Sequence, residues 1–490
     1  MTCSKPFLLL LILMTYSALQ GQTQDFTSNL YETYDRYKEK SLDKRRIKHR
    51  DIQPLINAKA LQAGFEVRTV GRSIEGRPLR LISIGKGDTD VFLWSQMHGN
   101  EPTATQAIFD ILNFLASPDQ GTEKRAILES VRLHFLPMLN PDGAEVFARR
   151  NALGIDINRD ALRLQSPEGQ TLKGVRDSLE AEFGFNLHDQ STYYNAERTA
   201  KPATISYLAP AYNYEKEINT VRANAMKVIG YMNGILQKYA PGQVGKYNDD
   251  FEPRAFGDNI QKWGTSAILI ESGGYPEDVE KQEIRKLNYV SILSAIYTIA
   301  TGSYEKMTLE GYESIPENDR KLFDLKIEGV TYPLLGQEYL MDIGIQRPEV
   351  DDASHDDFWY SSRVVDLGDL STYYGYQTLD ATGYHLEQAK VYHEVVPDMK
   401  SVEKLDFWSL LQEGVAYVRV ADLPKENINS PYPVHLISTK FKPAELRLGV
   451  GMNPTFILSK AGDPKYAVVN GFLYNLSSRE GNGKNSMIYR

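Results

Sequence analysis

Short apolar runs alternate with helix-like stretches over roughly the first three hundred positions of the chain. The strand-like runs lie at residues 65–85, 91–98, 131–139 and 265–270, and the helical stretches lie at 102–116, 213–238 and 278–301. Strands that alternate with helices of about ten or more residues are typical of a layered α/β fold. The pattern therefore predicts a mixed, mostly parallel central sheet with helices on both faces.

The character of the chain changes after residue 304. Helical periodicity fades, and short strand-like pieces separated by turns take over, such as 323–327, 415–420 and 466–472. Such spacing of short strands is typical of a β-rich domain. We place a boundary within 304–320, and expect residues 22–304 to form one domain and residues 305–490 a β-rich accessory region.

The first residues have the pattern of a secretory signal. Lys5 supplies a positive charge, residues 7–14 form an apolar run, and small or polar residues follow up to Gly21. This order is that of a cleaved signal peptide, and the run is shorter than the roughly 20 residues that span a bilayer. We expect residues 1–21 to be removed, which leaves a secreted or periplasmic protein with no membrane span.

Composition narrows the chemistry that the mature protein can carry out. The only cysteine, Cys3, lies in the predicted signal, so neither a thiolate ligand nor a cysteine nucleophile remains. A chain without disulfides suits a periplasmic or bacterially secreted enzyme. The net charge of −9 argues against a nucleic-acid partner, because nucleic-acid binders usually carry a basic stripe. Any metal must be held by histidine and carboxylate.

A His-x-x-Glu motif directly follows the apolar run at 91–94. His98 and Glu101 share one turn, and zinc is bound mainly by His, Cys and Asp or Glu side chains. His188, at the end of another apolar run, is either the third ligand or a buried structural histidine. His134 also lies in an apolar run but has no acidic flanking residue, so we expect it to be structural.

Two further motifs supply candidate binding and catalytic groups. Asn158 and Arg159 offer an amide and a planar guanidinium, which can bind a carboxylate; alternatively, Arg159 pairs with Asp160 in a structural loop. Glu271 ends a buried apolar run, where burial favours a raised pKa suited to a general base. An adjacent zinc ion would lower that pKa, and Glu271 can also be a simple strand end.

Together these motifs resemble the zinc metallocarboxypeptidases of the carboxypeptidase A/B type, over roughly residues 50–303. Seven family motifs occur in the family order, from Gly-Arg-Ser-x-Glu-Gly-Arg, through Asn-Pro-Asp-Gly, to a strand-borne Glu. They lie at residues 71–77, 98–101, 140–143, 149–151, 156–159, 188 and 271. Asn100, next to the motif's Glu, matches the regulatory and bacterial branches and differs from the Arg of pancreatic members.

The resemblance implies a single Zn2+ ion held by His98, Glu101 and His188, with an open position for water. Glu271 would act as the general base on that water and pass the proton to the leaving amine. Asp156 would accept a hydrogen bond from the far nitrogen of His98 and orient that ligand.

The resemblance also assigns groups to the substrate. Arg149 would stabilise the tetrahedral oxyanion. Asn158 and Arg159 would hold the C-terminal carboxylate of a peptide or protein, which makes cleavage exo-acting. Tyr247 would close over the substrate, although Phe251 competes for this role.

The side-chain pocket and the substrate class stay open. Residues 254–258 would line the pocket, where Asp258 would favour a basic C-terminal residue and Phe256 an apolar one. The leading hypothesis is an exported zinc carboxypeptidase. The alternatives are a murein-peptide amidase or peptidase, a deacylase of the aspartoacylase type, and a binding module that keeps zinc without catalysis.

Overall fold

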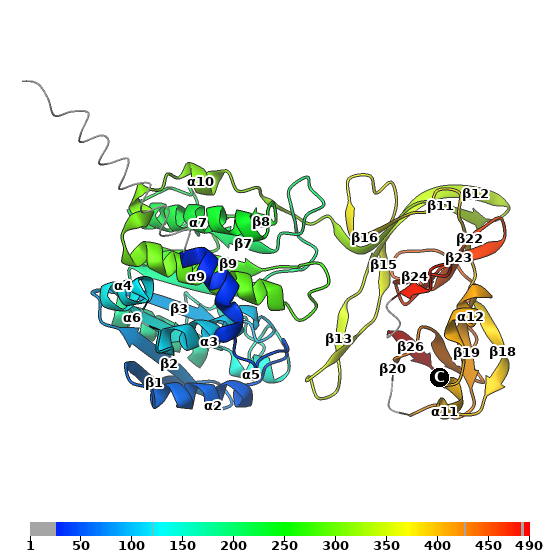
Figure 1. Ribbon diagram of the computed structural model, residues 1–490, viewed down its shortest axis with the longest axis horizontal. Coiled ribbons are helices and arrows are strands. Elements are labelled where there is room, and N and C mark those ends of the chain that lie inside the picture. The colour runs from blue at the N-terminus through cyan, green and yellow to red at the C-terminus, as the bar shows by residue number, and fades with distance from the viewer. Residues whose placement is uncertain (1–25, 120, 426–427, 482–484) are drawn as a thin grey trace, which may run out of the picture. The chain divides into compact units, whose positions relative to one another are not determined.

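The computed structural model describes the chain except for its first residues and three short gaps. The described residues are 26–119, 121–425, 428–481 and 485–490. The predicted signal peptide and Cys3 lie outside them. Within the described chain, residues up to 197 and 201–320 form one compact unit, and residues 321–490 with 198–200 form a second (Figure 1). The boundary between the two units lies after Arg320, at the C-terminal end of the interval 304–320 predicted from the sequence.

An eight-stranded sheet forms the centre of the first unit, in the order β1-β2-β4-β3-β5-β9-β7-β8. These strands are β1 (Phe65–Arg72), β2 (Pro78–Gly85), β3 (Thr89–Ser95), β4 (Val131–Leu136), β5 (Phe183–Asp189), β7 (Ile205–Leu208), β8 (Val244–Lys246) and β9 (Ser266–Ser272). Strands β4, β3, β5 and β9 are parallel neighbours, as are β7 and β8. The remaining neighbours are antiparallel, so the predicted mixed, mostly parallel sheet is confirmed.

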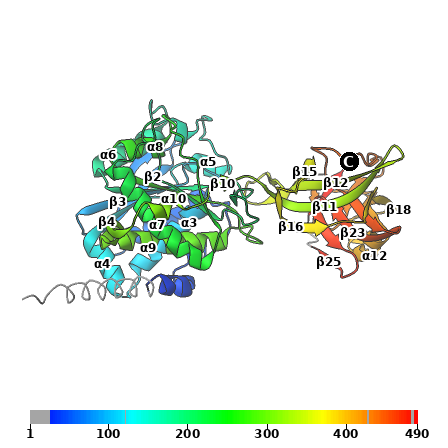
Figure 2. The same ribbon diagram turned by 90° about the horizontal axis from the view of Figure 1, so that it is seen from above.

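Helices cover both faces of this sheet, as predicted. One face carries α3 (Thr103–Ala116), α4 (Thr122–Ser130), α7 (Thr220–Tyr239) and α9 (Gln282–Ala300), and the other α6 (Pro167–Leu179) and α8 (Phe256–Lys262). Figure 2 shows α6 and α8 above the sheet and α4 and α9 below it. Side chains alternate between the two faces along a strand. Leu93 therefore packs in the apolar core beneath α3, α4, α7 and α9, whereas Phe92 and Trp94 pack in the apolar core beneath α6 and α8.

Shorter elements complete the first unit. They are a helical segment at 26–33, η1 (Tyr34–Arg36), α2 (His49–Ala60), α5 (Pro141–Glu145), η2 (Ile157–Arg159), β6 (Asn195–Ala196), η3 (Ser303–Lys306), α10 (Glu310–Glu313) and β10 (Asn318–Asp319). None of the described helices is long and apolar enough to cross a membrane.

Two of the element boundaries that differ from the sequence expectation have local reasons. Strand β3 ends at Ser95, because Gln96 has a positive φ of 51°, and His98 therefore lies on a loop. Helix α7 begins only at Thr220, after Asn219 caps it by accepting a hydrogen bond from the backbone N–H of Arg222. Asparagine is a preferred residue at this cap position.

Residues 305–320 pack within the first unit. Tyr312 is buried, and its hydroxyl accepts a hydrogen bond from the backbone N–H of Ala209 at 3.3 Å. The Asn318 amide donates to the side-chain oxygen of Gln190 at 2.8 Å. Strand β10 pairs with β6, so this stretch is joined to the first unit by both backbone and side-chain bonds.

The second unit is strand-rich, as expected from the sequence. One sheet has the order β15-β12-β11-β17-β22-β23-β24-β25 with β16 beside β11, and another the order β18-β19-β21-β26-β20. The elements are β11 (Leu322–Leu334), β12 (Gln337–Gln346), β13 (Glu349–Asp351), β14 (Phe358–Tyr360), β15 (Arg363–Gly368), β16 (Tyr374–Asp380), β17 (His385–Glu387), β18 (Lys390–Val396), α11 (Met399–Val402), α12 (Phe407–Gln412), β19 (Val415–Val420), β20 (Asn429–Ser430), β21 (His435–Ser438), β22 (Phe456–Lys460), β23 (Asp463–Val469), β24 (Phe472–Asn475), β25 (Glu480–Gly481) and β26 (Ser486–Tyr489).

Candidate metal centre and surrounding site

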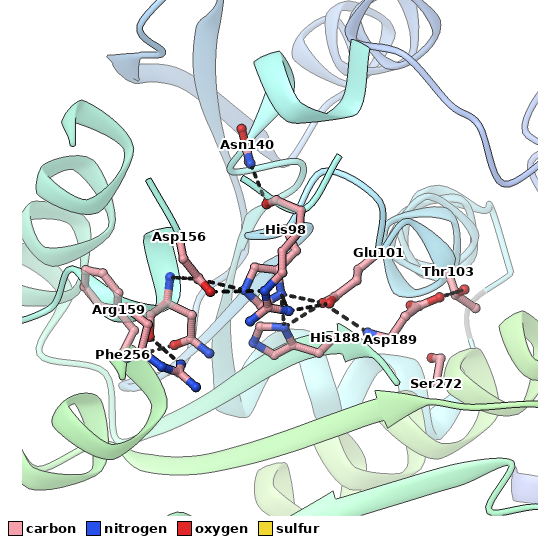
Figure 3. A network of polar contacts seen from close by, with 12 residues as sticks. His98, Glu101, Thr103, Asn140, Asp156, Arg159, His188, Asp189, Phe256 and Ser272 are labelled. Atoms are coloured by element: carbon pink, nitrogen blue, oxygen red, sulfur yellow. Dashed lines mark hydrogen bonds and ion pairs between the residues drawn. The ribbon is translucent and has the colours of Figure 1, made fainter. Parts of the chain in front are cut away.

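Three buried side chains converge at the carboxyl ends of the central strands (Figure 3). His98 and Glu101 come from the loop after β3, and His188 comes from β5. The Nδ1 atoms of both histidines lie 2.8 Å from Oε2 of Glu101 and 3.2 Å from each other. The sheet thus joins two ligand candidates that are adjacent in sequence with one that is distant.

The spacing of these atoms fits a single zinc ion. Ligand atoms about 2.0–2.1 Å from a tetrahedral zinc ion lie about 3.3 Å from one another. The three candidate ligand atoms all lie within 4.8 Å of one another, and no other such group of His, Cys, Asp or Glu occurs in the described part of the chain. Two imidazoles and one carboxylate, with no thiolate, are also the donor set of many catalytic zinc sites.

Asp156 fixes the orientation of His98. Its Oδ1 lies 3.2 Å from Nε2 of His98, and its Oδ2 accepts a hydrogen bond from Nε of Arg149 at 3.0 Å. Burial alone would raise the pKa of Asp156, but the hydrogen bond from His98 and the charge of Arg149 hold that pKa well below its ordinary value. A carboxylate at Nε2 favours the tautomer with the proton there, which leaves the Nδ1 lone pair facing the cluster.

Burial and mutual contacts also shift the pKa values of the three clustered side chains. Burial would raise the pKa of Glu101, but the charge of His98 and the hydrogen bonds to His188 and His98 together outweigh it, so this pKa is lowered. The pKa of His98 is raised because the charge of Glu101 and the hydrogen bond to Asp156 outweigh burial. Burial lowers the pKa of His188. A carboxylate and a neutral imidazole are the forms that bind zinc.

Arg149 lies directly beside the candidate ligands. Its Nη1 is 3.1 Å from Nδ1 of His98 and donates a hydrogen bond to Oε1 of Glu101 at 3.2 Å. The side chain is 43% exposed, so it borders both the buried cluster and solvent. A guanidinium in this position can stabilise negative charge that develops next to the cluster.

Glu271 lies next to His188 on the neighbouring strand. The two residues are register partners in the parallel β5–β9 pair, so their side chains leave the same face of the sheet. Glu271 is buried, and its pKa is raised well above the ordinary value by burial and then by the charges of Glu101 and Asp189. These surroundings suit a carboxylate that accepts a proton at neutral pH.

Tyr247 follows β8 and belongs to the same surroundings. Its pKa is raised by burial and by the negative charge of Glu271. The ring packs edge-on against Tyr194, with centroids 6.0 Å apart. Phe251, the competing lid residue, instead packs against Tyr214 at 5.1 Å. The sequence does not single out Tyr194, because no spacing rule distinguishes it from the other tyrosines of the chain.

The candidate carboxylate-binding residues lie on η2 beside α8. Asn158 Oδ1 accepts a hydrogen bond from the backbone N–H of Phe256 at 2.9 Å. Arg159 Nε lies 3.5 Å from Oε2 of Glu252, and Arg254 donates to both oxygens of that carboxylate at 3.1 and 3.2 Å. Two guanidiniums therefore hold a carboxylate of the chain itself at this position.

Asp160 does not pair with Arg159. Its carboxylate accepts hydrogen bonds from the backbone N–H groups of Gln165 and Ser166, both at 2.8 Å, and from the Ser166 hydroxyl at 2.7 Å. These bonds hold the loop before α6 and leave Arg159 directed at Glu252.

The two pocket candidates differ in their surroundings. Phe256 is fully buried in the apolar core on its face of the sheet. Asp258 Oδ1 accepts a hydrogen bond from the backbone N–H of Glu252 at 3.0 Å, and burial raises the pKa of Asp258 to about 7.

His134, expected to be structural, bonds to Ser83 and Asp90 at 2.8 and 2.7 Å and lies outside the metal cluster.

Comparison with known proteins supports the motif-based resemblance. Residues 58–243 match the family model described as zinc carboxypeptidase. The catalytic chain of human carboxypeptidase N is 30% identical over 115 residues, which cover 19% of this chain and 25% of the relative. Carboxypeptidase E of Caenorhabditis elegans is 33% identical over 118 residues, which cover 20% of this chain and 25% of the relative. The chain thus spans about a quarter of the length of these curated relatives.

A solved metallo-carboxypeptidase from Burkholderia cenocepacia is 17% identical, with a TM-score of 0.43, over 52% of this chain and 69% of that chain. The family match contains the whole metal cluster but ends before Tyr247 and Glu271. Residues 58–243, whose buried His-Glu-His cluster fits one zinc ion, are therefore similar to the zinc carboxypeptidase family.

Proposed function

We propose that the first unit is a metallocarboxypeptidase that hydrolyses the C-terminal peptide bond of peptides or proteins. The observation that carries this proposal is the pairing of His188 with Glu271 on adjacent parallel strands. It brings a buried carboxylate with a raised pKa next to three side chains that fit a zinc ion. Zinc, when bound, supplies Lewis-acid chemistry, which activates water and polarises a carbonyl.

The chain's own residues would divide the remaining work. His98, Glu101 and His188 hold the metal. Glu271 takes the proton of the attacking water and delivers it to the leaving amine. Arg149 stabilises the negative charge of the tetrahedral oxyanion.

Recognition of a free C-terminus would rest on Asn158 and Arg159. The contact between Arg159 and Glu252 supports this role, because it brings a carboxylate to that guanidinium. A bound substrate would take over this position through its terminal carboxylate, which limits cleavage to the last residue. Tyr247 would cover the bound residue, in keeping with its place beside Glu271.

We also propose that the protein is exported, on the strength of the signal-like residues 1–21. N-terminal sequencing of the mature protein from a secreting host tests this proposal directly. A mature protein that still begins with residues 1–21 would contradict it.

The activity is tested with purified, zinc-loaded protein and a peptide mixture, with release of free C-terminal amino acids as the readout. We expect Glu271→Gln to lower kcat at least about 100-fold, in line with the usual contribution of a general base. Glu182→Gln is the matched control, because Glu182 lies just before β5, at the opposite end of that strand from His188, and should retain full activity.

Equal, slow release by the native protein and Glu271→Gln would contradict the enzymatic proposal. Muropeptides and N-acyl amino acids, assayed in parallel, distinguish the other hydrolases. Faster turnover of either class than of peptides would replace the carboxypeptidase proposal with the corresponding alternative.

A further inference from the structure

Lys281 is a buried lysine at the start of α9, and its ammonium group contacts two strands of the central sheet. Its Nζ donates a hydrogen bond to Oδ2 of Asp189 at 2.9 Å and another to the backbone carbonyl of Ser272 at 2.9 Å. The side chains of Lys281 and Asp189 are 6% and 7% exposed. A lysine is rarely buried without a charged partner, because removing an ammonium from water is costly.

The backbone of Lys281 is strained as well. Its φ of 52° and ψ of 34° lie in the left-handed region, which non-glycine residues seldom occupy and which costs free energy. Such conformations persist where the surrounding contacts hold them in place. Here the conformation accompanies a side chain that reaches inward between β5 and β9.

Asp189 links this lysine to the metal ligands. It directly follows His188 in the chain, and its backbone N–H donates to Oε2 of Glu101 at 3.3 Å. Its Oδ2 also accepts a hydrogen bond from the hydroxyl of Thr103, at the start of α3, at 2.5 Å (Figure 3). Asp189 is therefore bonded to the two segments that carry all three candidate ligands.

Ser272 links the same lysine to the catalytic carboxylate. It directly follows Glu271, and it is the register partner of Asp189 in the β5–β9 pair. The Ser272 hydroxyl accepts a hydrogen bond from the amide of Asn288 in α9 at 2.9 Å. Helix α9 therefore holds the end of β9 at two points, through Lys281 and through Asn288.

We propose that Lys281 is a positioning residue that fixes Glu271 relative to His188 and Glu101. One ammonium group bonds to the residue after His188 and to the residue after Glu271, so it sets how the two strand ends meet. This inference rests on the proposed function, because it assigns Glu271 the role of general base.

Lys281→Met removes the ammonium group and retains most of the side-chain volume. At saturating zinc we expect kcat to fall at least about tenfold, while KM stays within about threefold, because no substrate-binding residue is altered. The zinc dissociation constant, measured by competition with a chelator, should rise about tenfold, as is usual when groups that orient metal ligands are lost.

Lys59→Met is the matched control. Lys59 is also buried, and its Nζ donates to the side-chain oxygen of Asn113 at 2.8 Å, away from the metal cluster. This substitution should lower the midpoint of thermal unfolding and leave kcat and zinc affinity unchanged. The inference is overturned if Lys281→Met behaves like Lys59→Met, or if its kcat at saturating zinc stays within twofold of the native value.

Asp189→Asn retains the shape of the partner and removes its charge. It keeps the inference testable if Lys281→Met does not fold, because the same fall in kcat and in zinc affinity is expected. If the native protein hydrolyses none of the substrates, the proposed function fails, and zinc affinity then decides the positioning role. Unchanged zinc affinity in both variants would overturn that role independently of activity.

Discussion

Asp156 shows how one carboxylate can set the orientation of a candidate metal ligand. It contacts His98 on the nitrogen that faces away from the cluster and is itself held by Arg149. This contact favours one tautomer and one orientation of the imidazole, with Nδ1 facing the cluster. A buried histidine elsewhere in the chain, His134, has a similar carboxylate partner in Asp90, but it has no neighbouring ligands.

These two carboxylate–histidine pairs allow a matched test. We expect Asp156→Asn to raise the zinc dissociation constant about 10- to 100-fold, because groups that orient metal ligands usually contribute this much. Asp90→Asn should lower the free energy of unfolding and leave zinc affinity unchanged. Chelator competition and chemical denaturation of both variants provide the two measurements. Equal zinc affinities for the two variants would contradict the orienting role of Asp156.

At the scale of elements, the segment between β8 and α8 contacts a half-buried acid, Asp258. Asp258, in the first turn of α8, accepts a hydrogen bond from the backbone N–H of Glu252. Glu252 in turn contacts Arg159 and Arg254. The segment that would recognise a substrate carboxylate is therefore held in part by a hydrogen bond to a half-buried carboxyl group.

This half-buried acid predicts a pH dependence of stability. Burial raises the pKa of Asp258 from the ordinary 3.8 to about 7, so the folded protein binds this proton more tightly than the unfolded chain does. Its contribution to stability is complete below about pH 4 and is lost as the pH rises through about 7. Asp258→Asn stays neutral and should therefore match the native protein near pH 4, but exceed its free energy of unfolding at pH 8 by at least about 1 kcal/mol.

Denaturant titrations of native protein and Asp258→Asn between pH 4 and pH 8 measure this difference. Asp43→Asn, at an exposed position, is the control and should show no comparable change with pH. A constant difference between native protein and Asp258→Asn across the range would contradict the expectation.

The sequence could predict the elements and the ligand candidates, because both depend on local patterns. Alternation of apolar runs with helices indicates the α/β sheet, and the His-x-x-Glu spacing indicates two ligands on one turn. The contacts of Tyr194 and Lys281 could not be predicted. Tyr194 packs against Tyr247, and Lys281 bonds to the ends of β5 and β9, so these contacts join segments that are distant in sequence.

At the scale of the whole molecule, residues 305–320 matter most for where the chain can be divided. Tyr312 and Asn318 lie within the first unit and bond to Ala209 and Gln190. Strand-like character in the sequence does not reveal these contacts, because they depend on how the end of the first unit folds back on itself.

A pair of truncations tests this division. A chain that ends at residue 320 should unfold cooperatively and bind zinc with the affinity of the full chain. A chain that ends at residue 304 loses the buried Tyr312, and its free energy of unfolding should be at least about 3 kcal/mol lower, the usual cost of losing a large buried side chain. Circular dichroism during denaturation, with zinc titration, compares the two chains; equal stabilities would contradict the expectation.

The register between β5 and β9 also has a consequence for folding. The candidate zinc ligands come from β5 and the loop after β3, whereas Glu271 arrives with β9. A slip of β9 by one residue would place Ile270 or Ser272 opposite His188 and turn the carboxylate to the other face. A chain trapped in that arrangement could still capture metal but would be inert, so during refolding metal uptake should precede the recovery of hydrolysis.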